Sequence, residues 1–333
     1  FDAFYKSTWS AETQSAGFFW LARLACRRGD YEEALEYVEK SLIRNWHNMN
    51  GRTLKAALLR KLGADASAFV AECLAIDPLS QGCLYEQAMA EGSEELWLKT
   101  MRTESHNFKE LAQEYIEAGL YEDAIHILGA CPKKDPICWY TLGYIYTQKE
   151  ENKKATEAFE KGETACPDYC FPNRVEEIRI LETVIAGSPQ APMAHYYLGN
   201  LLYDKKQYTQ AAGHWEKATE EKKDLSPAYR NLAIFYYNKE NDHGKAMDVM
   251  EKACTLDQEY PRIWLEYDQL AARMNLPVMK RLEVMESHPA VTAGRDDLYL
   301  RYLTLLNDVG RYQEALDGLR SRQFHPWEGG EGK

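Results

Sequence analysis

Tyrosine, asparagine and arginine side chains are the residues of this sequence best suited to recognise a ligand. A tyrosine offers a rigid apolar ring with a polar tip, which suits contacts with peptides or sugars. Asparagine donates and accepts hydrogen bonds, and arginine pairs with carboxylates. The candidates lie in the middle and second half of the chain: Tyr140, Tyr144, Tyr196, Asn200, Tyr203, Arg230, Asn231, Tyr237 and Arg262. The alternative interpretation is structural: the tyrosines pack on one another or on neighbouring helices, and the asparagines cap backbone groups between helices.

The sequence contains no recognisable catalytic or metal-binding motif. Its eight histidines form no H-E-x-x-H or H-x-x-E-H pattern, and no G-x-S-x-G sequence or phosphate-cradling loop occurs. Its eight cysteines show no C-x-x-C spacing, and we interpret them as buried thiols of a reducing compartment, the cytoplasm. His195 is interpreted as a packing residue between helices. We therefore expect a protein that is not an enzyme, with no catalytic residues, no metal and no cofactor.

The charge balance argues against two classes of partner. The net charge is −12, whereas nucleic acid requires a basic surface and anionic membranes attract basic segments. No run of 18 apolar residues is present, so no membrane span is predicted. With 45% hydrophobic and 28% charged residues, the chain has the composition of a folded protein.

Helices must position the candidates, because the segment from Pro136 to Tyr169 has a helical hydrophobic period. Its apolar residues follow i, i+3, i+4, i+7 spacing, and small, aromatic and proline positions follow them. These residues are Trp139, Leu142, Gly143, Tyr146, Ala155, Phe159, Gly162 and Pro167. The pattern resembles the tetratricopeptide repeat, a hairpin of two helices. The small residue at its eighth position, Gly143, allows the second helix to approach.

Related patterns cover most of the chain. They occur at residues 15–48, 105–135, 192–225, 226–260 and 296–323, and in weaker form at 49–78 and 261–289. The unit 226–260 carries a one-residue insertion around Asn241–Gly244. Two long intervals predict additional helix: a degenerate hairpin at 79–103 and one extra helix at 173–187. The resemblance therefore implies an all-α, right-handed superhelical solenoid of eight or nine helical hairpins.

The predicted organisation begins with a linker or partial helix at 1–14 and an N-terminal repeat array at 15–170. The extra helix occupies 171–190, and a C-terminal repeat array spans 191–323. We interpret the Gly-rich segment 324–333 as a tail leading to missing sequence of a larger protein.

Two residues of the tail, His325 and Trp327, are expected to dock on another part of that larger protein. An exposed tryptophan is costly, and the glycines beside it permit close approach of the backbone.

The second half also resembles, more narrowly, the C-terminal repeat region of a bacterial protein family. The matching segments are Pro172–Glu177, Tyr196–Lys205, Tyr229–Ala233, Tyr267–Leu270, Arg295–Leu298 and, most specifically, His325–Lys333. Members of that family carry an N-terminal β-sandwich domain, similar to galactose mutarotase and of unknown function. The resemblance implies a link to carbohydrate and places any activity outside this chain.

In tetratricopeptide proteins the first helix of each hairpin lines a concave groove, where the resemblance places the candidate residues. Chaperone-binding members hold a peptide carboxylate with asparagine, lysine and arginine side chains from three successive repeats. Asn200, Asn231 and Arg262 match that arrangement. Tyr196 and Glu266 replace two of its cations, which disfavours a chaperone-tail clamp. A weaker acid-binding pocket, formed by the asparagines and Arg262 together with Arg230, is the more plausible interpretation.

The leading hypothesis is an interaction scaffold that binds a protein or peptide through the groove. The partner is either a separate protein or the rest of the same polypeptide. The alternative is an accessory glycan-binding module of a carbohydrate-processing enzyme, and a third possibility is a homo-oligomerisation surface.

Overall fold

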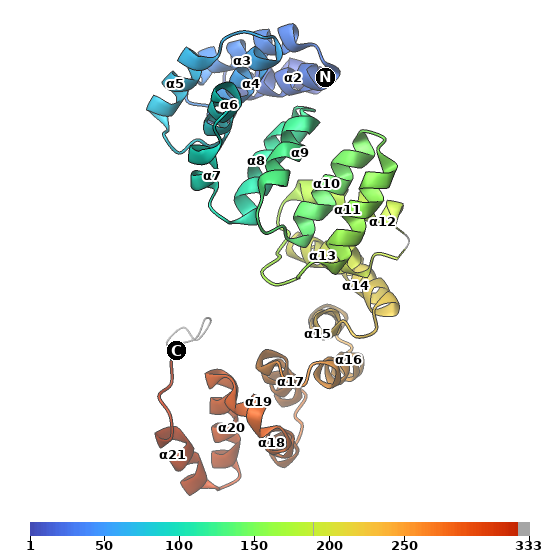
Figure 1. Ribbon diagram of the computed structural model, residues 1–333. Helices are drawn as coiled ribbons and strands as arrows, with labels where there is room; N and C mark the ends of the chain where they lie inside the picture. The colour runs from blue at the N-terminus through green and yellow to red at the C-terminus, as the bar shows by residue number, and fades with distance from the viewer. Residues whose placement is uncertain (189, 326–333) are drawn as a thin grey trace. The chain divides into compact units, whose positions relative to one another are not determined.

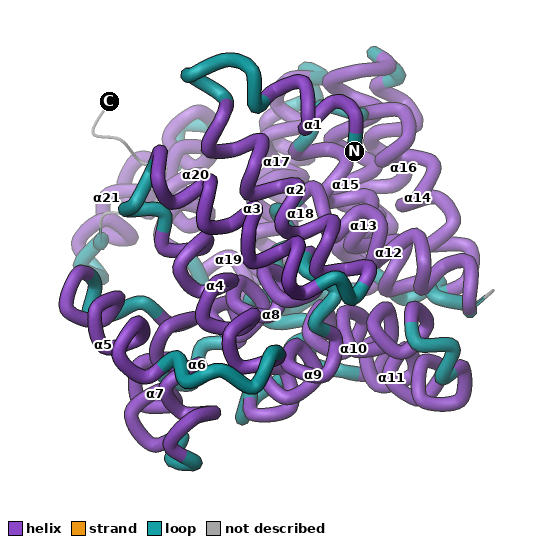
Figure 2. The backbone as a smooth tube through the Cα atoms, turned by 90° about the horizontal axis from the view of Figure 1, so that it is seen from above, coloured by secondary structure: helices purple, strands orange, loops and turns teal. Residues whose placement is uncertain are grey.

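The computed structural model describes residues 1–188 and 190–325 (Figure 1). In these ranges the chain forms only helices, turns and loops, as Figure 2 shows by colour. The prediction of an all-α array of helical hairpins is confirmed. No helix within these ranges has the length and apolar character needed to cross a membrane. The chain divides into two compact units, Phe1–Cys170 and the residues from Phe171 onward.

The first unit contains a short leading helix and five hairpins. Its helices are α1 (Asp2–Ser7), α2 (Gln14–Arg28), α3 (Tyr31–Arg44), α4 (Met49–Lys61), α5 (Ser67–Ile76), α6 (Gln81–Glu91), α7 (Glu95–Met101), α8 (Ser105–Glu117), α9 (Tyr121–Ala130), α10 (Pro136–Gln148) and α11 (Asn152–Thr164). The start of α10 shows how local sequence sets a boundary. The Asp135 carboxylate accepts a hydrogen bond from the Cys138 N–H (2.8 Å), and Pro136 occupies the first turn.

The degenerate hairpin is α6 and α7, and an aromatic contact replaces the repeat pattern there. Tyr85 and Trp97 are both fully buried, with ring centroids 5.0 Å apart. Glu86 of α6 is also buried, and it accepts hydrogen bonds from Arg60 of α4 and from the Tyr115 hydroxyl of α8. The aromatic pair therefore holds α6 and α7 together, and the polar contacts of Glu86 tie this hairpin to α4 and α8.

The second unit begins with the extra helix and continues with four hairpins. Its helices are α12 (Val175–Gly187), α13 (Pro192–Asp204), α14 (Tyr208–Glu221), α15 (Ser226–Phe235), η1 (Tyr236–Glu240), α16 (His243–Leu256), α17 (Pro261–Arg273), α18 (Val278–Ser287), α19 (Pro289–Ala293), α20 (Asp296–Asp308) and α21 (Tyr312–Arg320). The short helix α19, between the third and fourth hairpins, was not predicted.

The helix η1 is a π-helical turn that extends α15 without a break. The Asn241 N–H bonds to the Tyr236 carbonyl, five residues earlier. A π-turn holds one residue more than an α-helical turn, so it absorbs the insertion that the sequence placed slightly later, around Asn241–Gly244. Asn241 ends the turn in the left-handed region (φ 55°), which asparagine tolerates better than most residues.

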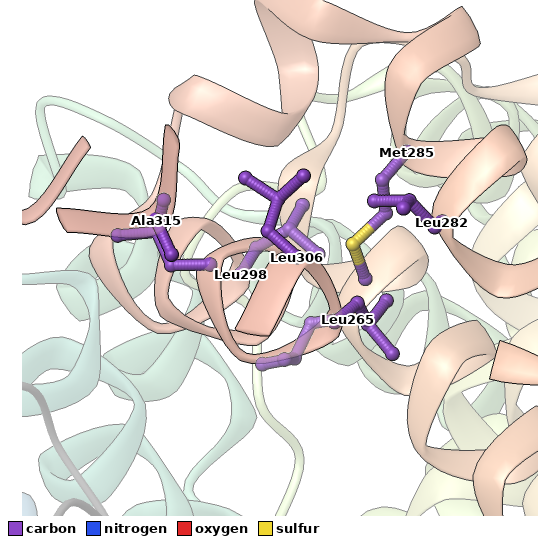
Figure 3. Packing of buried hydrophobic residues seen from close by; sticks show 8 residues of the cluster. Leu265, Leu282, Met285, Leu298, Leu306 and Ala315 are labelled. Carbon is purple, nitrogen blue, oxygen red and sulfur yellow. The ribbon is translucent and has the colours of Figure 1, made fainter. Parts of the chain in front are cut away.

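The last two hairpins share an apolar core. Leucine and methionine side chains from α17, α18 and α20 meet there, together with Ala315 of α21 (Figure 3). The core residues are Leu265, Leu282, Met285, Leu298, Leu303, Leu305, Leu306 and Ala315. Because α17 and α18 share this core with α20, the third hairpin of the unit depends on the fourth.

Candidate functional site

Polar side chains from α13, α15 and α17, the first helices of three successive hairpins, form a hydrogen-bonded row. The Asn231 amide donates to Asn200 Oδ1 (2.9 Å), and the Trp215 indole N–H donates to the same oxygen (3.0 Å). Arg230 donates to Asn231 Oδ1 (3.1 Å), which extends the row toward α17. The two asparagines therefore bond to side chains of neighbouring helices.

The hydrogen bond from Trp215 to Asn200 depends on a glycine at the eighth position of the repeat. A Cβ on Gly199 of α13 would overlap the Trp215 ring of α14. The absence of a side chain therefore lets the indole lie directly on the α13 backbone, within reach of Asn200. The small residue expected from the repeat pattern thus has a direct consequence for the polar row.

The row ends at Glu266 of α17, whose carboxylate is shared by two arginines. Arg230 donates to both of its oxygens, and Arg262 Nε lies 3.1 Å from Oε1. Burial alone would lower the pKa of Arg230, but its hydrogen bonds to Glu266 and the charge of that carboxylate raise the pKa above its ordinary value. The predicted acid-binding residues are thus brought together, with a carboxylate of the chain itself between the arginines.

The role of Glu266 was missed in the sequence, where it counted only as a departure from the chaperone-tail pattern. A signal was present: Glu266 stands four residues after Arg262, the spacing of an ion pair on one helix face. Its pairing with Arg230 could not be predicted in the same way, because that contact depends on how closely α15 and α17 approach.

A hollow of about 180 Å³ lies beside the row, between α15–η1 and α17. We call it the inner hollow. Its lining combines apolar side chains, two amides, a tyrosine ring and charged groups: Ala233, Ile234, Tyr237, Asn238, Met250, Glu266, Gln269, Leu270 and Arg273. Its volume is below the range of about 300–1,000 Å³ that is typical of small-molecule sites. The inner hollow therefore suits one or two side chains of a larger partner.

Arg273 also lines the inner hollow. Within residues 1–188 and 190–325 it forms no ion pair with an acidic side chain. Its guanidinium carbon lies 5.8 Å from the centroid of the Tyr237 ring, within the range of a cation–π contact. Tyr237 in turn stacks on His243, with centroids 4.6 Å apart. The ring orients the guanidinium but leaves its hydrogen-bond donors available, and Arg273 is exposed.

The first two predicted tyrosines are core residues, which corrects their assignment to an open groove. Tyr140 and Tyr144 are both buried. The Tyr140 ring lies against α11, where a Cβ on Gly162 would overlap it, and its hydroxyl donates to Glu163 (2.7 Å). The packing interpretation therefore applies to these two side chains.

The three later tyrosines are half-buried and differ in their surroundings. Tyr203 packs against the rings of Tyr208 and Trp215, with centroids at 4.9 and 5.3 Å, and burial raises its pKa. The Tyr196 ring lies 5.4 Å from that of Tyr197. Among the five predicted tyrosines, Tyr237 is the one that lines the inner hollow.

The predicted docking residues lie at the end of the described chain. The His325 backbone N–H donates to the Asp296 carboxylate (2.8 Å), and its imidazole is exposed. This backbone hydrogen bond is the main cause that lowers the pKa of Asp296. Trp327 lies outside the described residues, so docking of the tail stays a prediction.

A contact between two histidines in the second unit was not predicted. His195 Nδ1 of α13 and His214 Nδ1 of α14 lie 2.8 Å apart, so one ring must donate the proton that the other accepts. Burial, followed by the charges of His214 and Lys217, lowers the pKa of His195 to about 4, and burial also lowers that of His214. The pair is therefore neutral near pH 7. No group of three or more metal-ligating side chains is arranged for an ion in the residues that the structure describes.

Comparison with known proteins identifies the repeat in two segments. Two family models described as tetratricopeptide repeat match residues 137–169 and 178–227. The first match covers α10 and α11, and the second runs from α12 through α14 into α15.

Similar solved structures include MamA from Desulfovibrio magneticus RS-1, yeast Tom70 and YrrB. MamA is 18% identical over 61% of this chain and 96% of its own, with a TM-score of 0.31. Tom70 is 16% identical over 96% of this chain and 80% of its own, with a TM-score of 0.36. YrrB, described as a protein of this repeat class with an unusual peptide-binding site, is 15% identical over 71% of this chain and 96% of its own, with a TM-score of 0.27. At these scores, nothing about a ligand is transferred from them.

Proposed function

Because the chain contains tetratricopeptide repeats, we propose that it is an interaction scaffold that binds a protein segment on the second unit. The observation that carries the proposal is the inner hollow, an open depression of side-chain size beside a fixed polar row. Repeat proteins of this kind are built from hairpins that contact only their neighbours, which leaves extended surfaces for partners.

The polar row supports this assignment because it makes one wall of the inner hollow rigid. Glu266 is held by two arginines, and Arg230 is in turn bonded to Asn231. A wall fixed in this way loses little conformational entropy when a partner binds, which favours affinity. The apolar floor formed by Ile234 and Leu270 adds the burial that a peptide side chain needs.

The partner we propose is a protein or peptide, either in a separate chain or elsewhere in the same polypeptide. A segment of the parent protein, such as the β-sandwich domain suggested by the family resemblance, could meet the same contacts. We do not extend the proposal to glycans. The tyrosines that suggested sugar binding are either buried, as Tyr140 and Tyr144 are, or packed on neighbouring rings, as Tyr203 is.

A library of random peptides displayed on phage tests the proposal when it is selected against three forms of the chain. In Gln269→Trp, an indole fills the inner hollow from an exposed position on α17. The matched control is Asp248→Trp, which places the same ring at an exposed position on α16. We expect the wild type and D248W to enrich the same peptide consensus and Q269W to lose it.

Two results would count against the proposal. One is enrichment of the same consensus by all three forms, which would place the binding surface elsewhere. The other is failure of the wild type to enrich any consensus at all. Circular dichroism melting curves of the three forms establish that each variant is folded.

A further inference from the structure

We propose that the inner hollow binds an acidic side chain of its partner, which pairs with Arg273. A neighbouring apolar side chain of the partner packs on the floor of the hollow. This inference rests on the proposed function and specifies the partner's chemistry. It also moves the acid-binding position away from Arg230 and Arg262, where the sequence pattern placed it.

The local charge is opposite to that of the molecule as a whole. The chain carries a net charge of −12. Arg273 and Glu266, however, both line the inner hollow, and Arg230 and Arg262 pair with that Glu266, so these four side chains together carry a net positive charge. A positive region on an otherwise acidic protein attracts acidic segments, whereas the acidic surface elsewhere on the chain repels them, so such a segment is directed to this region.

Glu266 decides which of these arginines is available to a ligand. Its two oxygens already accept hydrogen bonds from Arg230, and one of them also accepts from Arg262. A ligand carboxylate would have to displace Glu266 to reach that pair, and it would leave a partly buried carboxylate unpaired. Arg273 requires no such exchange, because within the described residues its guanidinium lies over the Tyr237 ring and forms no ion pair or hydrogen bond.

The remaining lining residues define what stands beside the acid. Ile234 and Leu270 are apolar, so they favour an aliphatic or aromatic neighbour. Asn238 and Gln269 are exposed amides at the edge of the hollow, where they can bond to a peptide backbone. The ligand class is therefore an acidic–apolar peptide segment, recognised through a side chain and not through a chain terminus.

Three synthetic peptides with capped ends test this inference. Each has a central leucine flanked by two residues on either side, which are all glutamate, all glutamine or all lysine. The caps remove both terminal charges, so a clamp for a C-terminal carboxylate gives no signal. Fluorescence anisotropy of labelled peptides at low ionic strength gives the Kd for the full chain.

We expect the glutamate peptide to bind about two- to fivefold more tightly than the glutamine peptide, since one partly exposed charge pair has about this effect. The lysine peptide should bind most weakly. The glutamate preference should shrink as salt is added, because the pair lies near the surface.

Two arginine variants assign the preference to one side chain. Arg273→Gln should reduce it to near unity while leaving the affinity for the glutamine peptide unchanged. Arg320→Gln is the matched control, because Arg320 is also an exposed arginine in the last turn of a helix, α21. This control should keep the full preference.

Glu266→Gln tests whether Glu266 keeps Arg230 and Arg262 from pairing with a ligand carboxylate. Losing the carboxylate frees Arg230 and Arg262 for a ligand, so the glutamate preference should rise several-fold above that of the wild type. A preference that stays equal or falls in E266Q would show that Glu266 does not withhold the arginine pair.

The outcomes separate this inference from the proposed function. If glutamate and glutamine peptides bind equally, or if the preference survives R273Q, the inference is overturned. If Q269W abolishes binding of both peptides while no preference exists, the proposed function stands and the acidic partner does not. If Q269W changes nothing, both fail, and if no peptide binds, the inference fails.

Discussion

Two hairpins, α10–α11 and α17–α18, solve the same packing problem in opposite ways at the eighth position of the repeat. In the first, Gly143 stands there, and the Phe159 ring lies so close that a Cβ would overlap it. In the second, Asp268 stands there, almost fully buried. It accepts two hydrogen bonds from Arg281 of α18 (2.8 and 2.9 Å) and one from Arg301 of α20 (2.9 Å).

The difference shows what the small residue contributes to a hairpin. With Gly143, two helices close directly on each other through apolar contact, and the hairpin is complete by itself. With Asp268, the two helices α17 and α18 are joined where they cross by an ion pair to Arg281. The carboxylate also pairs with Arg301, which a third helix, α20, supplies. The second arrangement makes the third and fourth hairpins of that unit one cooperative structure, in agreement with their shared leucine core.

The largest expected effect comes from removing the charge at the second crossing. Asp268→Ala leaves the mostly buried Arg281 and the partly exposed Arg301 without their carboxylate, so the free energy of unfolding of the second unit should fall by about 4 kcal/mol. Urea unfolding measures the loss, and hydrogen exchange should localise it to α17, α18 and α20. Asp268→Asn, which keeps the shape and one acceptor, should lose less. A loss below about 1 kcal/mol for D268A would contradict the charged crossing.

A pH titration sharpens the comparison, because α13–α14 combines a glycine crossing at Gly199 with the polar contact between His195 and His214. The pKa of folded His195 is about 4, below its unfolded value of about 6.5. Between these values the unfolded chain binds a proton that the folded chain does not. The free energy of unfolding should therefore fall by up to about 3 kcal/mol as pH drops from about 6.5 to about 4.

The control for the titration is His195→Gln, which cannot titrate. Thermal melts across this range should show a shallower decline for H195Q than for the wild type. Parallel declines in the two proteins would mean that other groups cause the acid sensitivity.

A smaller effect is expected at the apolar crossing. Gly143→Ala pushes the Phe159 ring and the facing backbone of α11 apart, at a cost of about 2 kcal/mol. Gly213→Ala is the matched control, because Gly213 lies inside helix α14 and no atom beyond its own helix backbone and chain neighbours stands within 4 Å of its added Cβ. That change should stabilise the protein by about 0.5–1 kcal/mol, since alanine favours helix. Equal effects of the two substitutions in a melting experiment would contradict the packing argument.

The sequence predicted the hairpins well because the repeat pattern is a set of packing requirements. Gly143 and Gly199 are small for a reason visible in the pattern, and the extra helix before α13 followed from the interval between such residues. The one-residue insertion in the unit 226–260 indicated an irregularity where η1 lies, but it was placed slightly too late in the chain. The part that failed was the state of individual side chains: Tyr140 and Tyr144 have groove spacing but are buried.

The candidate site shows the same limit. The pattern correctly gathered Asn200, Asn231 and Arg262, because repeat geometry fixes which helix faces adjoin. It could not reveal that Glu266 satisfies the arginines or that Arg273 stays available. Those outcomes depend on side-chain rotamers and on distances between helices, which a one-dimensional spacing does not contain.

The most direct test of the account is a crystal structure of the chain with the capped glutamate peptide. We expect the peptide to lie between η1 and α17, with its leucine against Ile234 and Leu270, a glutamate carboxylate at hydrogen-bond distance from Arg273, and Glu266 still paired with Arg230. A peptide bound elsewhere on the chain, or one whose carboxylate displaces Glu266, would contradict it.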